Sequence, residues 1–460
     1  MDMTLLDLLE TTDDFLWGPG TLALLVGTGL FLTLRTRFLP WRNLGYALGS
    51  ALGRDARATT REGDVSPFAS LMTALAATIG TGNIVGVATA LVAGGPGALI
   101  WMELAALFGL STKLAECTLA VKFRRRNCRG QMSGGPMYVM RDGLHLGWLG
   151  SAMGAAFAVF AVCSSFGIGS MAQANSIAGA VEAAFGVPTA ITGLVTAGLA
   201  LTVILGGVRG IATVSAAVVP LMAVLYLGAS LAVIWRCRQA LPAGLAGIFQ
   251  CAFSPKAAAG GAAGTALRWG IARGVFSNEA GMGSAAISAA SAATDSPARQ
   301  GYISMTAVFF DTMVVCTVTG LVLCCSGVLG AADAAGNTVD GAALVILAFQ
   351  KALGPVGGLL AGVSIILFAF SSILGGAYHG EKAFEYLFGA RRLLLYRVFF
   401  ALAALWGAVA RLETVFRFSD ICNALMCVPN LLCLLMLSGT VARELQAFQP
   451  EIQRSSRKKL

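Results

Sequence analysis

Long apolar stretches divide most of this chain into segments of similar length. A helix needs about 20 mostly apolar residues to cross a bilayer, and the runs here are continuous rather than alternating, unlike the strands of a membrane barrel. The pattern predicts eleven membrane-spanning helices, at 17–36, 68–93, 97–121, 148–182, 188–206, 211–235, 266–292, 301–326, 356–388, 392–410 and 418–442. The apolar part of the segment 236–265 is too short to span, so we expect it to lie along the membrane surface or to cap the bundle.

The composition supports a membrane protein over the other classes. Charged residues are 12% of the chain and hydrophobic residues 57%, and a soluble domain carries about twice that charge. This argues against a soluble enzyme, a disordered chain and a secreted disulfide scaffold. Two histidines and no paired C-x-x-C motif give no sign of a metal centre. We therefore expect no cofactor, no nucleic acid and no obligate protein partner; the expected partner is the lipid bilayer.

The lysines and arginines are unevenly distributed between the predicted loops. If the N-terminus is outside, most of them fall in cytoplasmic loops and the C-terminal tail, as the positive-inside rule requires. The outer side then holds Arg236, Arg238, Lys256, Lys351, Arg411 and Arg417. We expect a multi-pass protein of a bacterial-type inner membrane, with the N-terminus outside and the C-terminus in the cytoplasm.

Two of the predicted helices contain glycine-rich polar interruptions. They lie at 80–86 in the second helix and at 277–284 in the seventh. Each interior glycine costs about 1 kcal/mol relative to alanine, and unbonded backbone in lipid costs several kcal/mol per group. Such a break persists where a bound ion or an amino-acid head group satisfies the freed groups. The alternative for the first break is close helix packing, because Gly82 and Gly86 form a G-x-x-x-G pair.

The two interruptions occupy corresponding places in two sets of five helices. An odd number of spans inverts the second set relative to the first, and paired breaks in inverted halves point to a transport site. The predicted fold is an all-α integral membrane protein with one N-terminal helix and a five-plus-five inverted-repeat core. The expected regions are an N-terminal helix and basic loop (1–62), a first repeat (63–240), an outer segment and second repeat (241–445), and a basic tail (446–460).

Four motifs resemble those of a known family. They are ATIGTGNI at 77–84, GGPMY at 134–138, SNEAGMGS at 277–284 and GEKAFEYLFG at 380–389. With these in order, residues 20–440 resemble the alanine or glycine:cation symporter family, the sodium:alanine symporters. The resemblance implies the inverted-repeat fold shared with the neurotransmitter:sodium symporters, and sodium-coupled import of small neutral amino acids rather than catalysis.

The resemblance also implies residues that contact the substrate. The unwound stretch at Thr81, Gly82 and Asn83 would contact the substrate, with Thr81 and Gly82 binding its carboxylate. Gln173 would make a polar contact, and Phe166 or Met171 would line the apolar side. Ser277 and Asn278 would contact the amino group or side chain, and Phe276 is a candidate gate. The alternatives are an interhelical hydrogen bond for Gln173 and simple packing for Phe276.

Sodium requires oxygen ligands. By the same resemblance, the hydroxyls of Ser371 and Ser372 and the carbonyls of Ala76, Ile79 and Phe368 would supply them. Without the resemblance, two serines in a membrane helix usually bond to their own backbone.

The sequence departs from the family pattern near both repeats. Gly376 stands where the family usually has tryptophan, His379 where tyrosine is usual, and Ala286 and Ala289 replace a proline and a histidine. We expect Gly376 to leave more room, so that the substrate could be larger than alanine, for example glutamine.

Three carboxylates, Glu103, Glu279 and Asp311, lie inside predicted spans, where such groups are functional candidates. They leave proton coupling open as an alternative mechanism. Glu279 could also organise the second break or pair with Arg273, and Asp311 could be a hydrogen-bonded anchor. A channel is less favoured, because it would need continuous polar faces along a pore.

Overall fold

The computed structural model describes residues 5–59, 61–253, 262–333, 336–410 and 412–457. Lys256, Arg411 and the last three residues of the basic tail, on which the charge distribution partly depends, lie outside the described residues.

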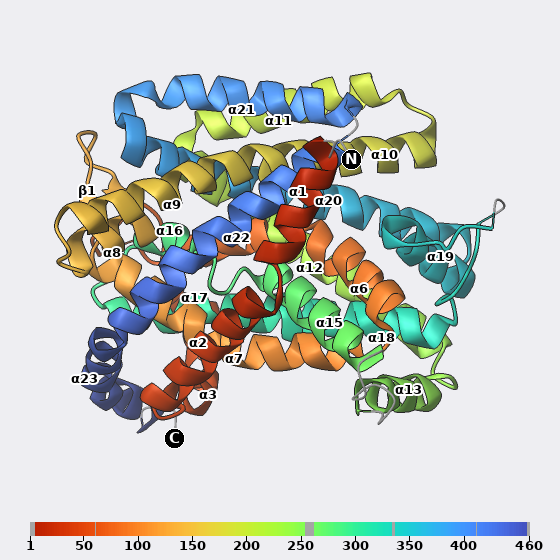
Figure 1. Ribbon diagram of the computed structural model, residues 1–460, viewed down its shortest axis with the longest axis horizontal. Helices are drawn as coiled ribbons and strands as arrows, with labels where there is room; N and C mark the ends of the chain where they lie inside the picture. Colours follow the sequence, from red (N-terminus) through yellow and green to blue (C-terminus); the bar gives the residue numbers. More distant parts are fainter. Residues whose placement is uncertain (1–4, 60, 254–261, 334–335, 411, 458–460) are drawn as a thin grey trace.

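The described chain is helical nearly throughout (Figure 1). The elements up to the first broken helix are α1 (Leu5–Leu16), α2 (Pro19–Arg35), α3 (Leu39–Arg42), α4 (Leu44–Leu52), η1 (Arg54–Arg57), α5 (Pro67–Thr78), η2 (Gly82–Gly86) and α6 (Val87–Gly94). The next are α7 (Ala98–Lys122), β1 (Arg125–Arg126), β2 (Met132–Ser133), α8 (Pro136–Gly143), α9 (Trp148–Phe166), η3 (Gly167–Met171), α10 (Ala172–Phe185), α11 (Thr189–Leu205), α12 (Gly207–Arg236) and α13 (Leu241–Phe253). The remainder are α15 (Ala262–Asn278), α16 (Ser284–Ala290), α17 (Pro297–Val308), η4 (Phe309–Cys316), α18 (Thr317–Ser326), α19 (Gly341–Leu353), α20 (Pro355–Phe388), η5 (Ala390–Arg392), α21 (Leu393–Val409), α22 (Glu413–Met436) and α23 (Ser438–Arg457).

Each of the eleven predicted spans corresponds to helix in the described chain. Eight helices are long and apolar enough to cross a membrane, and α5 with η2–α6 makes a ninth, bent by 52°. The other two predicted spans are α11, which has 17 residues, and 266–292, which the structure divides into α15 and α16. The all-α membrane fold with two broken helices is therefore confirmed, and the number of spans depends on how short and broken helices are counted.

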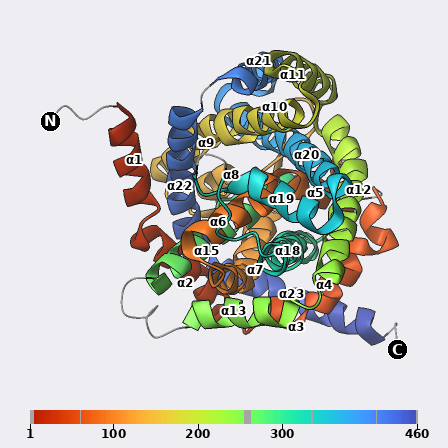
Figure 2. The ribbon, with the colours of Figure 1, turned by 90° about the vertical axis from the view of Figure 1, so that its right-hand side faces the viewer.

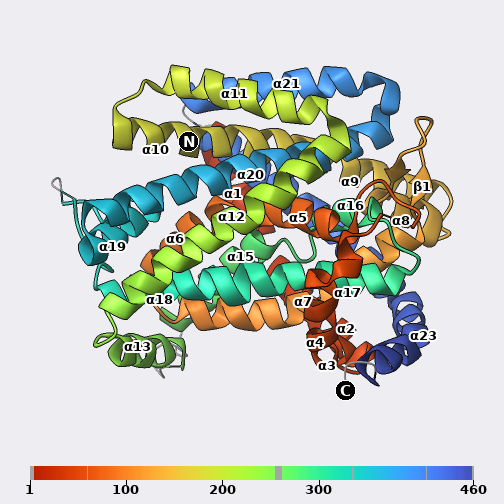
Figure 3. The same ribbon diagram turned by 180° about the vertical axis from the view of Figure 1, so that it is seen from behind.

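The helices form two groups that pack against each other. In the first group, called the bundle here, α7 packs on α15, α16 and α17, and α15 packs on α6. In the second, called the scaffold, α20 packs on α9 and α10, and α11 packs on α21 along one edge of the molecule (Figure 1). The long α12 crosses obliquely and contacts both α5 and α20 (Figure 3). Helix α1 lies beside α22 at the periphery (Figure 2).

The molecule has two distinct ends. At one, called the hairpin end here, the antiparallel pair β1–β2 joins α7 to α8, with Arg125 opposite Ser133. At the other, the short apolar helices α13 and α19 cover the ends of the long helices (Figure 1). Helix α13 is the apolar part of the 236–265 segment; it packs on α18, α7 and α15 and exposes Leu245, Phe249 and Phe253.

Candidate functional site

The first break separates α5 from η2. Gly80 lies between them, and its N–H donates to the side-chain oxygen of Asn83 at 2.9 Å. A Cβ on Gly80 would lie 2.2 Å from Ser372 Oγ, so the close approach to α20 requires glycine. Because the first N–H groups of a helix have no partner within it, we expect the amides at Thr81 and Gly82 to be available to a ligand.

The second break separates α15 from α16 and depends on a buried carboxylate. The backbone adopts positive φ at Glu279 (52°), Gly281 (101°) and Gly283 (82°). Glu116 of α7, 2% exposed, accepts from the N–H groups of Gly281 at 3.0 Å and Gly283 at 3.1 Å, and from the Asn430 amide at 2.6 Å. Our sequence reasoning missed Glu116, although a carboxylate inside the predicted span 97–121 was the available signal.

A buried lysine also bonds to the backbone of the second break. Lys113 is fully buried and donates to the backbone oxygen of Glu279 at 3.0 Å. The Glu279 carboxylate accepts from the Ser284 hydroxyl. It does not pair with Arg273, whose guanidinium lies 5.6 Å from the centre of the Phe276 ring. The Glu279 side chain therefore bonds within the second break rather than to Arg273.

Two small cavities lie between the breaks and the scaffold. The central cavity, about 30 Å³, is lined by Ala77, Thr78, Gly80, Thr81, Gly82, Ile168, Gln173, Phe276, Glu279, Met282, Ser372 and Asn423. The adjoining cavity, about 70 Å³ and called hairpin-side here, shares seven of these residues and adds Ala161, Ser164, Ser165, Gly169, Ser284, Ile287, Gly376, His379 and Met426.

Part of the predicted substrate site borders these cavities. Thr81, Gly82, Gln173 and Phe276 line the central cavity and Gly376 lines the hairpin-side one. The Thr81 hydroxyl donates to the Gln173 side-chain oxygen at 3.2 Å, so Gln173 makes an interhelical hydrogen bond at the cavity wall.

Three other candidates lie behind the cavity wall in a buried network. Asn83 donates to Asp311 at 2.8 Å and to the Ser277 hydroxyl at 2.9 Å, and Ser277 donates to Asp311 at 2.8 Å. Asn278 donates to the Thr312 hydroxyl, which itself donates to Asp311 at 2.9 Å. None of these side chains lines either cavity. They fix the two breaks to η4, which is the anchoring arrangement considered for Asp311.

Two candidates lie away from the cavities. Phe166 packs edge-on against Tyr396, with ring centres 5.4 Å apart, and contacts Phe400, because it faces α21 rather than the breaks. Glu103 accepts from the Thr317 hydroxyl at 2.8 Å and lines neither cavity.

The departures from the family pattern have specific surroundings. A Cβ on Gly376 would lie 2.9 Å from Gly169 Cα, so η3 fills the space on that side of Gly376. Gly169 and Gly376 therefore allow η3 and α20 to approach closely, and both residues also border the hairpin-side cavity. His379 lines the hairpin-side cavity with its Nε2 2.9 Å from the Ser288 hydroxyl. Ala286 and Ala289 are buried within α16, which remains helical.

The sodium candidates come together where the end of α5 meets α20. The Ser371 hydroxyl lies 2.8 Å from the Phe368 oxygen and 3.5 Å from the Ile79 oxygen. The Ser372 hydroxyl lies 3.5 Å from the Ala77 oxygen. Ala76, Ile79, Phe368, Ser371 and Ser372 are all buried. These oxygens form the kind of donor set that a hard monovalent cation prefers.

One cavity residue that the sequence reasoning missed is Asn423 of α22. It lines both cavities and accepts from the Ser164 hydroxyl at 2.5 Å. The signal was a lone amide inside the apolar stretch 418–442, but nothing in that stretch shows which way the amide points.

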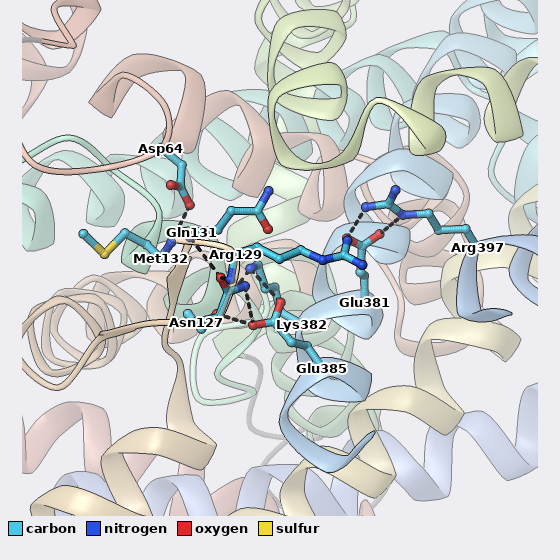
Figure 4. A network of polar contacts seen from close by, with 10 residues as sticks. Asp64, Asn127, Arg129, Gln131, Met132, Glu381, Lys382, Glu385 and Arg397 are labelled. Carbon is cyan, nitrogen blue, oxygen red and sulfur yellow. Dashed lines mark hydrogen bonds and ion pairs between the residues drawn. The ribbon is translucent and has the colours of Figure 1, made fainter. Parts of the chain in front are cut away.

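At the hairpin end, hydrogen bonds join the segment before α5 to the segment after α16. Arg124 donates to four backbone oxygens, among them Ala292 at 2.7 Å and Glu62 at 3.0 Å. Asp64 accepts from the Met132 N–H at 2.8 Å (Figure 4), and burial raises the pKa of Asp64 despite that bond. Arg124 thus joins the segment before α5 to the segment after α16, and Asp64 joins the first of these segments to β2.

A buried carboxylate on α20, Glu385, extends this contact to the scaffold. Glu385 accepts from Lys382 at 2.9 Å, from Asn127 at 2.9 Å and from the Ser133 hydroxyl (Figure 4). The bonds from Asn127 and Ser133 must break if the hairpin end opens, because they join the β1–β2 hairpin to α20; the bond from Lys382 lies within α20.

At the opposite end, a wider cavity of about 190 Å³, called the vestibule here, lies above Phe276. It is lined by Asp13, Asp14, Trp17, Arg268, Trp269, Ala272, Arg273, Phe276, Arg417 and Asp420. Phe276 borders both the vestibule and the central cavity, a position consistent with the gate that was expected there.

Comparisons with known proteins agree with this architecture. The model of the sodium:alanine symporter family matches residues 2–460. The chain is 48% identical to the sodium/alanine symporter AgcS of Methanococcus maripaludis, over 99% of this chain and 100% of that protein. It is 36% identical to the probable sodium/glutamine symporter GlnT of Bacillus subtilis, over 97% and 91%. MhsT in complex with L-phenylalanine has the same fold, with a TM-score of 0.54 at 16% identity, over 84% of this chain and 98% of MhsT. The chain belongs to the sodium:alanine symporter family and is a sodium-coupled amino-acid symporter.

Proposed function

We propose that the protein imports a small neutral amino acid of the alanine and glycine class with sodium, by alternating access. The observation that carries this proposal is that half-helix ends of opposite polarity meet at one cavity. The start of η2 brings the amides of Thr81 and Gly82 to the central cavity, and the end of α5 brings Thr78. A helix N-terminus attracts a carboxylate and a C-terminus attracts an ammonium group.

The proposed binding pose follows from that polarity. The substrate carboxylate accepts from the amides at Thr81 and Gly82, and its ammonium group donates to carbonyls at the ends of α5 and α15. Gln173 and Asn423 then face the rest of the substrate, because both line the same cavity.

The small size of the cavities supports a small side chain. One water needs roughly 10–15 Å³ of such volume, so the central cavity, about 30 Å³, holds only a few atoms. A substrate of glutamine size would have to extend into the hairpin-side cavity past Gly376 and His379. AgcS is named for alanine and GlnT for glutamine, so the two relatives leave both a small and a larger substrate open. Competition by a panel of neutral amino acids decides between these substrates.

Sodium is proposed to bind between α5 and α20, through the Ser371 and Ser372 hydroxyls and the carbonyls of Ala76, Ile79 and Phe368. Gly375 supports this site, because a Cβ there would lie 2.4 Å from the Ala77 backbone nitrogen. The two helices thus approach closely enough to share an ion. An ion at the end of α5 would fix the break that presents the Thr81 and Gly82 amides.

Alternating access is proposed to move the bundle against the scaffold. Closure at the hairpin end by Arg124 and Glu385, with Phe276 between vestibule and central cavity, supports two separate gates. We propose that the regions 63–240 and 241–445 are the two inverted repeats, flanked by 1–62 and 446–460. The basic hairpin end is proposed to face the cytoplasm of a bacterial-type cell, with the N-terminus outside.

Uptake into proteoliposomes tests the proposal. Labelled alanine is offered with a sodium gradient or a proton gradient imposed separately, and unlabelled neutral amino acids compete. We expect uphill uptake with the sodium gradient alone, inhibited by glycine and serine more than by glutamine. Uptake driven only by protons would support a mechanism through Glu103, Glu279 or Asp311 instead.

A further inference from the structure

A basic pocket lies at the hairpin end, where α2 meets α23. It has a volume of about 470 Å³ and is lined by Arg35, Arg37, Gly439, Ala442, Arg443 and Gln446. The three arginines are exposed, and a Cβ on Gly439 would lie 3.8 Å from Arg35 Nη2.

The positive charge of this pocket is not neutralised within the described chain. No ion pair between these three arginines and a carboxylate occurs among the described residues. Arg443 donates to the Thr440 hydroxyl at 3.4 Å, and the adjacent Glu444 is paired with Lys122. Three guanidinium groups therefore face one space without a counter-charge.

Apolar side chains on both sides place this pocket at the membrane boundary. Leu34, one residue before Arg35 in the membrane-spanning α2, is 55% exposed, and Met436, at the end of the membrane-spanning α22, is 58% exposed. Exposed apolar side chains of spanning helices face lipid chains. Phe38, the residue after Arg37, packs edge-on against Trp41 with ring centres 5.7 Å apart, and aromatic rings are enriched at the membrane–water interface.

The backbone turn that carries Arg37 is an unusual one for arginine. Arg37 has a φ of 55°, and the Phe38 N–H donates to the Thr33 oxygen at 2.9 Å, which closes a helix C-terminal motif. Glycine usually occupies the left-handed position of that motif. An arginine there brings a second guanidinium to the space already lined by Arg35.

We propose that this pocket binds the phosphate headgroup of an anionic phospholipid, whose acyl chains lie along the exposed apolar surfaces of α2 and α22. Guanidinium groups bind phosphate oxygens in bidentate geometry, and basic pockets at helix ends bind acidic headgroups. Inorganic phosphate shares the headgroup chemistry, but only a lipid also uses the apolar surfaces around Leu34 and Met436.

Lipid titration of the purified full-length protein tests the proposal. Phosphatidylglycerol, phosphatidylcholine or inorganic phosphate is added to the detergent-solubilised protein, and binding is followed by thermal stability and by native mass spectrometry. The test variant is R37A/R443A. The control is R42A/R54A, which removes the same charge from exposed positions outside the pocket.

We expect phosphatidylglycerol to bind wild type and control within about threefold of each other. At roughly fivefold per arginine near a membrane surface, R37A/R443A should bind about 25-fold more weakly. Native mass spectrometry of wild type should retain one phosphatidylglycerol preferentially, a readout that does not depend on how stable the variants are. Equal binding by R37A/R443A and wild type, equal binding of phosphatidylcholine, or an equal effect of inorganic phosphate would overturn the proposal.

Discussion

Removing the Ser371 hydroxyl should weaken sodium binding without altering the fold. Ser371 is fully buried on α20, and its Oγ lies 2.8 Å from the Phe368 oxygen and 3.5 Å from the Ile79 oxygen. Because Ser371 is fully buried and lines neither cavity, we expect no water to replace the lost ligand. A hydrogen-bond-like contact to a charge is worth roughly 1.5–3 kcal/mol, so S371A should raise the half-saturating sodium concentration roughly 10- to 100-fold.

The neighbouring serine should matter less. Ser372 lines both cavities, and its Oγ is 3.5 Å from the Ala77 oxygen. Water can take the place of its hydroxyl there, so S372A should raise the half-saturating sodium concentration only about threefold. The double variant S371A/S372A should need more sodium than either single variant.

A serine on the same helix provides the control. Ser364 is also fully buried, and its hydroxyl donates to the Leu360 oxygen of its own helix at 2.7 Å. S364A should therefore keep the sodium dependence of wild type. The assay is initial alanine uptake by proteoliposomes over a range of sodium concentrations, with protein amount and thermal stability measured for each variant. An unchanged sodium dependence of well-folded S371A would refute the proposed site.

Three further substitutions test the surroundings of the site. G80A introduces a Cβ 2.2 Å from Ser372 Oγ; we expect uptake to fall below a tenth of wild type while helix content, followed by circular dichroism, is retained. E116A leaves buried N–H groups at the second break without an acceptor, and each such group costs about 1–3 kcal/mol. We therefore expect a large fall in the midpoint of thermal unfolding. A midpoint equal to that of wild type would contradict the role given to Glu116. R124A removes four of the hydrogen bonds that close the hairpin end. In a background with the native cysteines replaced, a cysteine introduced at Ser165 should then react faster with a thiol reagent added at that end, and an unchanged rate would contradict the closure.

The membrane-spanning helices were predictable because a helix that crosses lipid needs a long, continuous run of apolar residues. Continuous apolar runs in the sequence predicted these helices, and glycines with polar neighbours predicted both breaks. The polar helices outside the bilayer follow no such rule. The region 446–460 was expected only as a basic tail, yet the structure continues α23 from Ser438 to Arg457 and buries Phe448 and Ile452 on one face.

The contacts that hold the site together were predictable only in part. Residue types at the breaks indicated a binding site, and Thr81, Gly82 and Gln173 do line the central cavity. The side chains of Asn83 and Ser277 do not, because Asp311 accepts hydrogen bonds from both. Which polar side chain satisfies which distant backbone group depends on tertiary packing.

The same limit explains the missed support from α7 and α22. Glu116 and Asn430 are far apart in sequence, and only the packed structure brings both to the backbone of Gly281. A single sequence shows that each is a polar residue in an apolar stretch, but not that they meet.

The most direct test of the account is whether sodium raises the affinity for the substrate. Alanine binding to the purified protein is measured by calorimetry in sodium chloride and in choline chloride at equal ionic strength and pH. If sodium orders the break that presents the Thr81 and Gly82 amides, alanine should bind roughly 5- to 150-fold more tightly in sodium, the usual range for coupled sites. The same alanine Kd in both salts would contradict the central claim.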